Sequence, residues 1–462
     1  MRISADEQRI CDRIAAREDE LVELAATLIG FDTTARNPGD PARQEVQLQG
    51  YLAARLAAAG AEIDLFEPDP AAMSGRPLVP PGLDFTGRPQ LIATLAGTGA
   101  ASEAAGASEA ARASEAAGAG RSLLFNGHID VVSAEPRDQW RSDPFVAEVR
   151  DGKLYGRGAC DMKGGIAAMV LAAETLAELG ITLNGDLLVA TNTDEESSGA
   201  GASALVQHGI KADAGIVTEP TGFATWVACR GSEYGVISVP GRPGHAEIRQ
   251  PDWRRGGAVN AIEKATVVLA AIDSLRREWA GRREYDHPHV SAPSLLATMA
   301  RAGEWPVTYP AACELTIATM FVAAQADEHG WGSRVRREVE KWIVRECAAA
   351  DDWLAEHPPS FDWWPNAVMP MEIPESDSIV TTVVQASADI GRPSRLGGLD
   401  SWYDGAALTQ LAGIPSIGYG PPGFDPDGVS VAHMVDEYVP VDGLVACAQG
   451  LAVTAMRFCG VG

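Results

Sequence analysis

The apolar and polar positions of the chain follow two periodicities, one typical of helices and one typical of short buried strands. Ile10, Ile14, Leu21, Leu24 and Leu28 recur at roughly helical spacing among charged residues, which predicts an amphipathic helical segment over 5–29. Further helices are predicted over 43–59 and 164–179. Short apolar runs typical of strands lie at 91–96, 122–130, 186–193 and 213–219. Because strand and helix alternate, we expect an α/β core built from βαβ units.

The alternation of predicted strands and helices stops near residue 231 and resumes after about residue 348. We therefore predict a discontinuous α/β domain formed by 1–229 and 348–462, with an α+β domain at 230–347 inserted into it. Residues 101–120 contain the tandem hexamers ASEAAG, ASEAAR and ASEAAG. We interpret this segment as a low-complexity insertion without chemistry.

The net negative charge of the chain argues against nucleic-acid and membrane partners. The 462-residue chain has 37 Lys and Arg against 63 Asp and Glu, and its net charge of −26 repels nucleic-acid backbones and anionic membrane surfaces. Apolar residues make up 46% and charged residues 22%, as in a folded protein. The seven scattered cysteines form no CxxC pair, and the first 30 residues lack the apolar stretch of a signal peptide. We expect a cytoplasmic protein with no nucleic-acid or membrane partner.

Imidazole and carboxylate groups gather at the ends of the predicted strands. They are His128 and Asp130 in LLFNGHIDVV, Asp161 in GRGACDMKGG, Glu195 and Glu196 in LLVATNTDEES, Glu219 in GIVTEP, and His433 in a late loop. Each position alone is more often structural, but burying several carboxylates together is costly unless a cation neutralises them. The set lacks thiolates and suits a catalytic site for Zn, or for Co or Mn. It also exceeds the needs of one ion, which favours two ions about 3.5 to 4 Å apart sharing a carboxylate.

Seven segments recur in a familiar order: GHIDVV, GRGACDMKGG, TDEESSGAGA, VTEPT, GRPGHAEI, GIPSIGYGPPG and AHMVDEYV. Together they resemble the M20 metallopeptidase family, especially its acetylornithine deacetylase and succinyl-diaminopimelate desuccinylase types. The resemblance implies an α/β dinuclear-metal hydrolase domain with an inserted α+β lid, which also serves as the dimer interface. It further implies that Asp161 bridges two metal ions. His128 and Glu219 would complete one metal site, and Glu196 and His433 the other.

The same resemblance implies roles for residues around the metals. Glu195 would be the general base, and Asp130 would accept a hydrogen bond from the ring nitrogen of His128 that faces away from the metal. The peptide after Asp161 would be cis. His245 in GRPGHA would stabilise the tetrahedral oxyanion from the lid, and Asn260 occupies another lid position of the family.

One departure from the family pattern bears on the substrate. Lids of the deacetylase type carry Asp-x-Arg at the end of a strand, where the guanidinium grips a substrate carboxylate, and an Asn before the preceding Pro. Here Ala318 and Met320 replace the Asp and Arg, and Val307 replaces the Asn. The substrate therefore either lacks that carboxylate, as a formylated amine would, or is held by another cation. Arg230, Arg242 and Arg249 are the candidates for such a cation.

These observations predict a metal-dependent hydrolase that cleaves an N-acyl or formyl amide of a small molecule and acts as a homodimer. Two alternatives stay open. A dipeptidase or aminopeptidase would share the metal apparatus, and a binding protein that had lost catalysis would share the sheet. The complete ligand set and the presence of Glu195 favour an enzyme.

Overall fold

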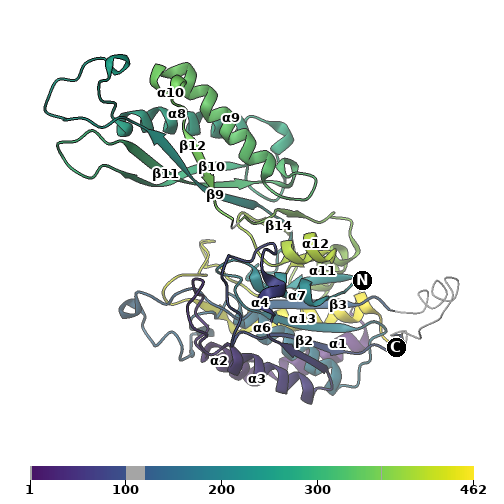
Figure 1. Ribbon diagram of the computed structural model, residues 1–462. Helices are drawn as coiled ribbons and strands as arrows, with labels where there is room; N and C mark the ends of the chain where they lie inside the picture. Colours follow the sequence, from purple (N-terminus) through teal and green to yellow (C-terminus); the bar gives the residue numbers. More distant parts are fainter. Residues whose placement is uncertain (1–2, 100–119, 366) are drawn as a thin grey trace. The chain divides into compact units, whose positions relative to one another are not determined.

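The computed structural model describes residues 3–99, 120–365 and 367–462, and its chain divides into two compact units (Figure 1). Unit 1 comprises the described parts of 1–227, 373–398 and 403–462, and unit 2 comprises 228–372 and 399–402. The low-complexity insertion expected at 101–120 lies outside the described residues, apart from Gly120.

Unit 1 is an α/β structure, as predicted. Its strands are β1 (Glu62–Phe66), β2 (Gln90–Leu95), β3 (Leu123–His128), β4 (Glu148–Arg150), β5 (Lys153–Tyr155), β6 (Leu187–Asn192), β7 (Ala214–Val217), β15 (Ser416–Gly418) and β16 (Tyr438–Pro440). The chain passes between the units within β8 (Thr225–Cys229) and β14 (Leu396–Leu399). Its helices are α1 (Ala5–Ala15), α2 (Glu18–Ile29), α3 (Glu45–Ala58), α4 (Pro70–Met73), α6 (Lys163–Glu178), α7 (Ala200–His208), α11 (Ser378–Asp389), α12 (Gly405–Ala412) and α13 (Val441–Cys459).

The main sheet of unit 1 runs in the order β1-β2-β6-β3-β7-β15-β8. Its centre is parallel, because β3 pairs in parallel with both β6 and β7, and β15 pairs in parallel with β7. Every residue of β3 and β6 is buried, since α6 packs against both strands and α7 packs against β6. Such a sheet directs the carboxyl ends of β3, β6 and β7 to one edge.

The helix expected over 5–29 is interrupted. It forms α1 and α2, and the break at Ala16 and Arg17 places the Arg17 guanidinium against Glu20 and Glu174. At the other end of the chain, α13 is long and apolar enough to cross a membrane by composition. However, 83% of that segment is buried inside the structure, so α13 serves as a core helix.

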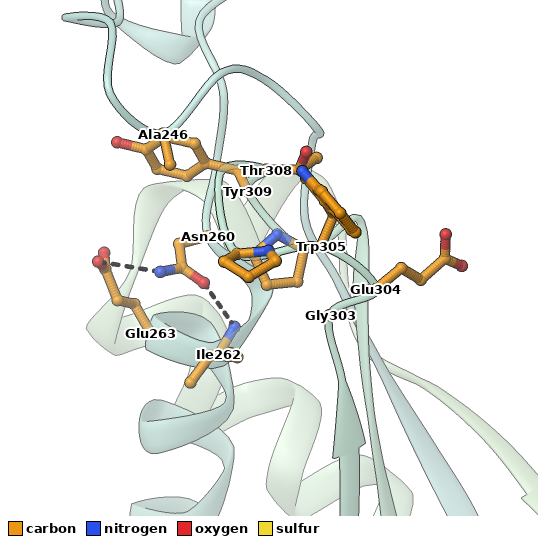
Figure 2. Close-up of a pocket in the computed structure, with 11 residues that line it drawn as sticks. Ala246, Asn260, Ile262, Glu263, Gly303, Glu304, Trp305, Thr308 and Tyr309 are labelled. Atoms are coloured by element: carbon orange, nitrogen blue, oxygen red, sulfur yellow. Dashed lines mark hydrogen bonds between the residues drawn. The ribbon is translucent and has the colours of Figure 1, made fainter.

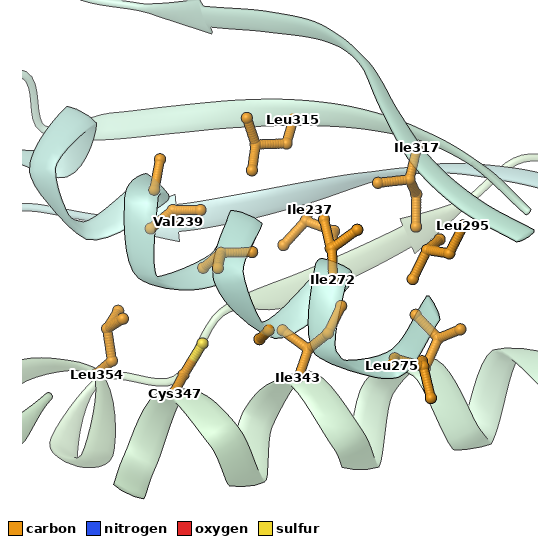
Figure 3. Packing of buried hydrophobic residues seen from close by; sticks show 14 of the residues in the cluster. Ile237, Val239, Ile272, Leu275, Leu295, Leu315, Ile317, Ile343, Cys347 and Leu354 are labelled. Atoms are coloured by element: carbon orange, nitrogen blue, oxygen red, sulfur yellow. The ribbon is translucent and has the colours of Figure 1, made fainter. Parts of the chain in front are cut away.

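Unit 2 is an antiparallel sheet with helices packed on it. The strands of this sheet are β9 (Gly231–Pro240), β10 (Ser294–Ala302), β11 (Ala312–Phe321) and β12 (Ser360–Trp363), and the helices are α8 (Ala261–Ala280), α9 (Ser333–Ala350) and α10 (Asp352–Glu356). The short strand β13 (Met371–Glu372) pairs antiparallel with β8 instead. The sheet order is β10-β11-β9-β12. Apolar side chains from α8 and α9 meet those of the sheet in one core, in which Ile272 and Ile343 lie near Ile237 and Leu315 (Figure 3).

The carboxyl boundary of this unit differs from the expected residue 347. Helix α9 continues to Ala350, and β12 pairs antiparallel with β9, with Phe361 opposite Ile237. Trp353 is buried in the core of unit 2, and its indole N–H donates to the carbonyl of Pro240 at 2.9 Å. Residues 348–372 therefore belong to unit 2, because they complete its sheet and core.

Candidate active site

The strand ends of unit 1 bring the predicted side chains together. His128 is the last residue of β3 and lies opposite Asn192, the last residue of β6. Glu195 follows three residues after Asn192, and Glu219 follows two residues after the end of β7. Since these strands are parallel neighbours, groups more than 90 positions apart in sequence, such as His128 and Glu219, meet at one edge.

Asp161 lies between two histidines. One of its carboxylate oxygens is 3.2 Å from Nε2 of His128, and the other is 3.3 Å from Nε2 of His433. His433 also approaches both carboxylate oxygens of Glu196 at 3.2 Å. His128, Asp161 and Glu196 each offer one ligand atom within 4.8 Å of the others. This geometry suits a carboxylate shared between two cations.

Glu195 and Glu219 lie beside this group. Nε2 of His128 is 3.9 Å from an oxygen of Glu195 and 4.0 Å from Oε1 of Glu219. Oε1 of Glu219 is buried and has no hydrogen-bond partner among the described residues. His433 is 52% exposed, so the cluster opens to solvent on its side.

Asp130 is placed differently from the expectation. The ring Nδ1 of His128 meets the backbone carbonyl of Asp130 at 2.9 Å, whereas the Asp130 carboxylate is 3.7 Å away. That carboxylate instead accepts the backbone N–H groups of Glu195 and Glu196, at 3.2 and 3.1 Å. A main-chain acceptor therefore orients the imidazole, and the side chain of Asp130 anchors the loop after β6.

Burial dominates the electrostatics of the cluster. It raises the pKa of Glu195 and of Glu219 well above the ordinary value and raises the pKa of Asp130 to about 8. Hydrogen bonds with Asp161 and Glu196 raise the pKa of His433 to about 10. These shifts describe several buried carboxylates with too little positive charge beside them.

The donor set fits divalent cations. A cation supplies the missing positive charge, and the unpartnered Oε1 of Glu219 is a buried lone-pair donor that requires an electrophilic partner. Imidazole nitrogen and carboxylate oxygen are ligands that zinc accepts in catalytic sites. The residues present therefore suit a metal centre at this position.

Two buried acids near the cluster were not anticipated from the sequence. Glu437 accepts the backbone N–H groups of Gly158, Cys160 and Asp161, at 3.2, 2.9 and 3.1 Å, and pairs with Arg157 at 2.6 Å. It therefore shapes the loop that presents Asp161. Its place in the quoted segment AHMVDEYV, four residues after His433, was the available signal. The peptide between Asp161 and Met162 is cis, as expected.

Asp404 is the second of these acids, and it is fully buried at the start of α12. One oxygen accepts the amide N–H of Asn192 at 2.6 Å, and Asn192 in turn accepts from Asn126 at 2.8 Å. Burial raises the pKa of Asp404 to about 6. These hydrogen bonds join Asp404 to Asn192, at the end of β6, and to Asn126, within β3. No local sequence pattern indicates this connection.

The lid candidates lie in unit 2. His245 is exposed, and its Nδ1 accepts the backbone N–H of Glu247 at 3.3 Å. Asn260 caps α8 by accepting the N–H of Ile262 at 3.0 Å (Figure 2). A capping role thus explains Asn260 without a ligand.

The two residues that replace the Asp and Arg of related lids lie in β11. Ala318 is buried opposite Leu296, and Met320 lies opposite Ser294, so neither position offers a cation. Two of the proposed substitute cations are engaged within unit 2. Arg230 donates to the carbonyls of Asp400 and Ala292, at 2.8 and 3.1 Å, and Arg242 donates to that of Trp253 at 2.6 Å.

Comparison with known proteins gives two kinds of relative. N-formyl-4-amino-5-aminomethyl-2-methylpyrimidine deformylase of Halalkalibacterium halodurans is 26% identical over 98% of this chain and 97% of its own length. Succinyl-diaminopimelate desuccinylase of Herminiimonas arsenicoxydans is 39% identical, over 36% of this chain and 45% of its own length.

Solved structures share the fold. A tripeptidase from Staphylococcus aureus superposes with a TM-score of 0.67 at 18% identity, covering 96% of this chain and 98% of its own. A dinuclear metal-binding peptidase of the M20 family from Bacillus subtilis gives 0.61 at 14% identity, covering 96% and 99%. The model of peptidase family M20/M25/M40 matches residues 124–457. This chain belongs to peptidase family M20/M25/M40.

Proposed function

We propose that this chain removes the formyl group from the N-formyl amide of a small aminomethyl heteroaromatic compound. The chain is a hydrolase of amide bonds, as its family and relatives are. The observation that carries the proposal is the match to the pyrimidine deformylase, which extends over nearly the whole of both proteins. The match to the desuccinylase is confined to about a third of this chain.

The lid strand supports a substrate without a carboxylate. Ala318 and Met320 provide no cation on β11, and the guanidinium groups of Arg230 and Arg242 are held by backbone carbonyls. An N-acyl amino acid would bring a carboxylate for which Arg249, which is exposed, is the remaining candidate partner of the three. A formylated amine has no carboxylate, so it needs no cation on the lid.

We assign the metal centre to two divalent ions, with zinc as the first candidate and cobalt or manganese as alternatives. His128, Asp161 and Glu219 would hold one ion, and Asp161, Glu196 and His433 the other. When bound, such ions polarise a carbonyl oxygen and lower the pKa of water toward neutrality.

The side chains then have separate tasks. Glu195 accepts a proton from the attacking water and delivers it to the departing amine nitrogen as the C–N bond breaks. The amine leaves neutral, and the other proton of the water stays on the acyl product, formic acid, which loses it to solvent and becomes formate. Asp130 holds the backbone of Glu195 and Glu196, so the base and a ligand keep a fixed spacing. His245 donates a hydrogen bond to the oxygen that gains charge as the carbonyl becomes tetrahedral.

We further propose a cytoplasmic homodimer that forms through unit 2. Apolar side chains are exposed on one helix and one strand of this unit: Ile262 and Leu269 of α8 by 50% and 42%, and Leu296 and Met299 of β10 by 40% and 48%. Packing of these side chains against a second copy would remove their apolar surface from water. Light scattering should give about twice the mass of one chain, and a stable monomer would contradict this part of the proposal.

A substrate panel tests the proposed reaction. The metal-loaded protein is assayed with the N-formyl aminomethylpyrimidine, N-acetyl amino acids, N-succinyl-diaminopimelate and dipeptides. We expect kcat/KM to be highest for the formyl compound. A higher value for a dipeptide would favour a peptidase, and binding of two metals per chain without turnover of any member would favour a binding protein.

A further inference from the structure

A buried arginine of unit 1, Arg36, faces the turn that carries the proposed base. Its side chain is 3% exposed, and its Nε lies 3.4 Å from a carboxylate oxygen of Asp194, which is also 3% exposed. Asp194 directly precedes Glu195 in the chain. Burying a guanidinium is costly unless it has partners, so the contacts of Arg36 indicate what it holds in place.

Asp194 has a backbone conformation that few residues other than glycine adopt. Its φ of 62° lies in the left-handed region, which Asp tolerates better than most residues. Its backbone carbonyl accepts the N–H groups of Ser198 and Gly199, at 3.0 and 2.7 Å, and its carboxylate accepts the hydroxyl of Thr193 at 2.8 Å. These contacts fold the residues after β6 into a tight turn that contains Glu195.

The guanidinium of Arg36 is itself fixed by the backbone. Its two terminal nitrogens donate to the carbonyls of Asp40 and Asp84, at 3.1 and 2.6 Å. Its Nε has no hydrogen bond among the described residues, and this nitrogen is the one that approaches Asp194. The guanidinium therefore presents a fixed positive charge to the turn, at a buried position where charges interact strongly.

The segment that ends at Arg36 pairs with the segment that carries Asp130. Thr34 and Val131 form a parallel bridge, flanked by backbone hydrogen bonds of 2.7 and 3.2 Å. Asp130 accepts the two N–H groups that follow Asp194, and Arg36 meets the Asp194 side chain. Two adjacent segments therefore hold the same turn, one at its backbone and one at its side chain.

We propose that Arg36 is a positioning residue, which acts through Asp194 to hold Glu195 at the distance and angle that proton transfer requires. The pair also compensates the negative charge of Asp194, which would otherwise repel the carboxylates of the neighbouring cluster. The inference rests on the proposed function for the task of Glu195, and on the contacts of Arg36 and Asp194 for the restraint.

Arg88 provides a matched control. Its side chain is 2% exposed, and it donates to the same two carbonyls as Arg36, at 3.1 and 2.8 Å. Among the described residues, the acid within ion-pair distance of Arg88 is Glu45, 3.6 Å from Nε, and not Asp194. Burial lowers the pKa of Arg88, and the charges of Arg36 and Asp194 act on that pKa in opposite directions. Arg88 thus lies near Asp194 in the same surroundings as Arg36, without the contact.

Steady-state kinetics at saturating metal tests the role in the reaction. We expect Arg36→Gln to lower kcat for the N-formyl aminomethylpyrimidine roughly 10-fold to 100-fold, the order expected when a reacting group is misplaced by about 1 Å. KM and the metal content per chain should change little, because the restraint does not touch the bound substrate. Arg88→Gln should leave kcat close to that of the unaltered protein.

Asp194→Asn tests the route of the effect. Asparagine keeps the shape, the tolerance for the left-handed conformation and an oxygen for Thr193, but it removes the charge that pairs with Arg36. We expect kcat to fall as in Arg36→Gln, and the double variant to be no slower than the slower single variant. The proposal would be overturned by an unchanged kcat in Asp194→Asn, by losses that multiply in the double variant, or by an equal loss in Arg88→Gln.

Hydrogen exchange supplies a readout that needs no turnover. N–H groups of the segment 195–199 donate to Asp130 and to Asp194. In the metal-loaded full chain, Arg36→Gln and Asp194→Asn should speed exchange in this segment roughly 10-fold relative to Arg88→Gln, because the turn opens more often. Unchanged exchange would overturn the restraint, whatever the substrate. Faster exchange in both variants, without deformylation by the unaltered protein, would support the restraint and reject the deformylase function.

Discussion

Replacing Glu437 with Gln should strongly destabilise unit 1, because this side chain organises the loop before α6. Its carboxylate accepts three backbone N–H groups of the segment Gly158 to Asp161 and pairs with Arg157. Both partners of the ion pair are almost fully buried, with side-chain exposures of 2% for Arg157 and 1% for Glu437. Glutamine keeps the shape but removes the charge.

The size of the effect follows from what remains after the substitution. One amide oxygen can still accept the N–H groups of Cys160 and Asp161, but the amide NH2 group then faces the N–H of Gly158 and the Arg157 guanidinium. Arg157 therefore loses its anion at a buried position. Breaking a buried pair by removing one partner costs about 3 to 5 kcal/mol. Glu148→Gln provides the matched control, since Glu148 pairs with Arg150 at 2.7 Å with side chains 48% and 24% exposed. Loss of such a surface pair costs about 0 to 1 kcal/mol.

Urea unfolding of the chelator-treated protein measures both variants. Because the two units can unfold separately, circular dichroism is followed for two transitions. The free energy of both variants is taken from the transition of unit 1, which contains Glu437 and Glu148 and which Trp279→Ala in unit 2 should leave unchanged. We expect Glu437→Gln to lower the free energy of unfolding by about 3 kcal/mol more than the control. A difference below about 1 kcal/mol would refute the reasoning that this carboxylate is required to neutralise Arg157.

Three further predictions concern catalysis, metal and core. Glu195→Gln should lower kcat about 100-fold to 10,000-fold while the metal content, measured by mass spectrometry, stays unchanged; normal turnover would remove Glu195 from the role of base. Dialysis against a chelator should abolish hydrolysis, and added zinc, cobalt or manganese should restore it; full activity in the metal-free protein would contradict the proposed centre. Trp279→Ala should destabilise unit 2 by about 3 to 5 kcal/mol in urea unfolding, since Trp279 is fully buried, and a neutral effect would contradict the packing described.

Sequence patterns predicted the strands that position the candidate site. The apolar runs at 122–130, 186–193 and 213–219 correspond to β3, β6 and β7, and parallel pairing of these strands accounts for the meeting of His128 with Glu219. Strand-end positions can be read from sequence because periodicity and strand direction together fix the edge at which a side chain emerges.

Other parts depend on contacts that periodicity does not encode. The side chain of Asp130 was expected to accept a hydrogen bond from the ring of His128, but the backbone carbonyl of Asp130 accepts it instead. The Asp130 carboxylate accepts from the loop after β6, and the sequence does not reveal the geometry of that loop. Glu437 and Asp404 act through partners distant in sequence. The boundary expected at residue 347 falls inside α9, because the pairing of β12 with β9 is not visible in the sequence pattern.

The Asp130 carboxylate accepts hydrogen bonds from two adjacent backbone N–H groups, and this arrangement limits how the site can evolve. Glu195 and Glu196 are neighbours in sequence with different proposed tasks, and one anchor restrains both. A change at Asp130 would therefore disturb proton transfer and cation affinity at once. Altering either property alone requires substitutions elsewhere in the cluster.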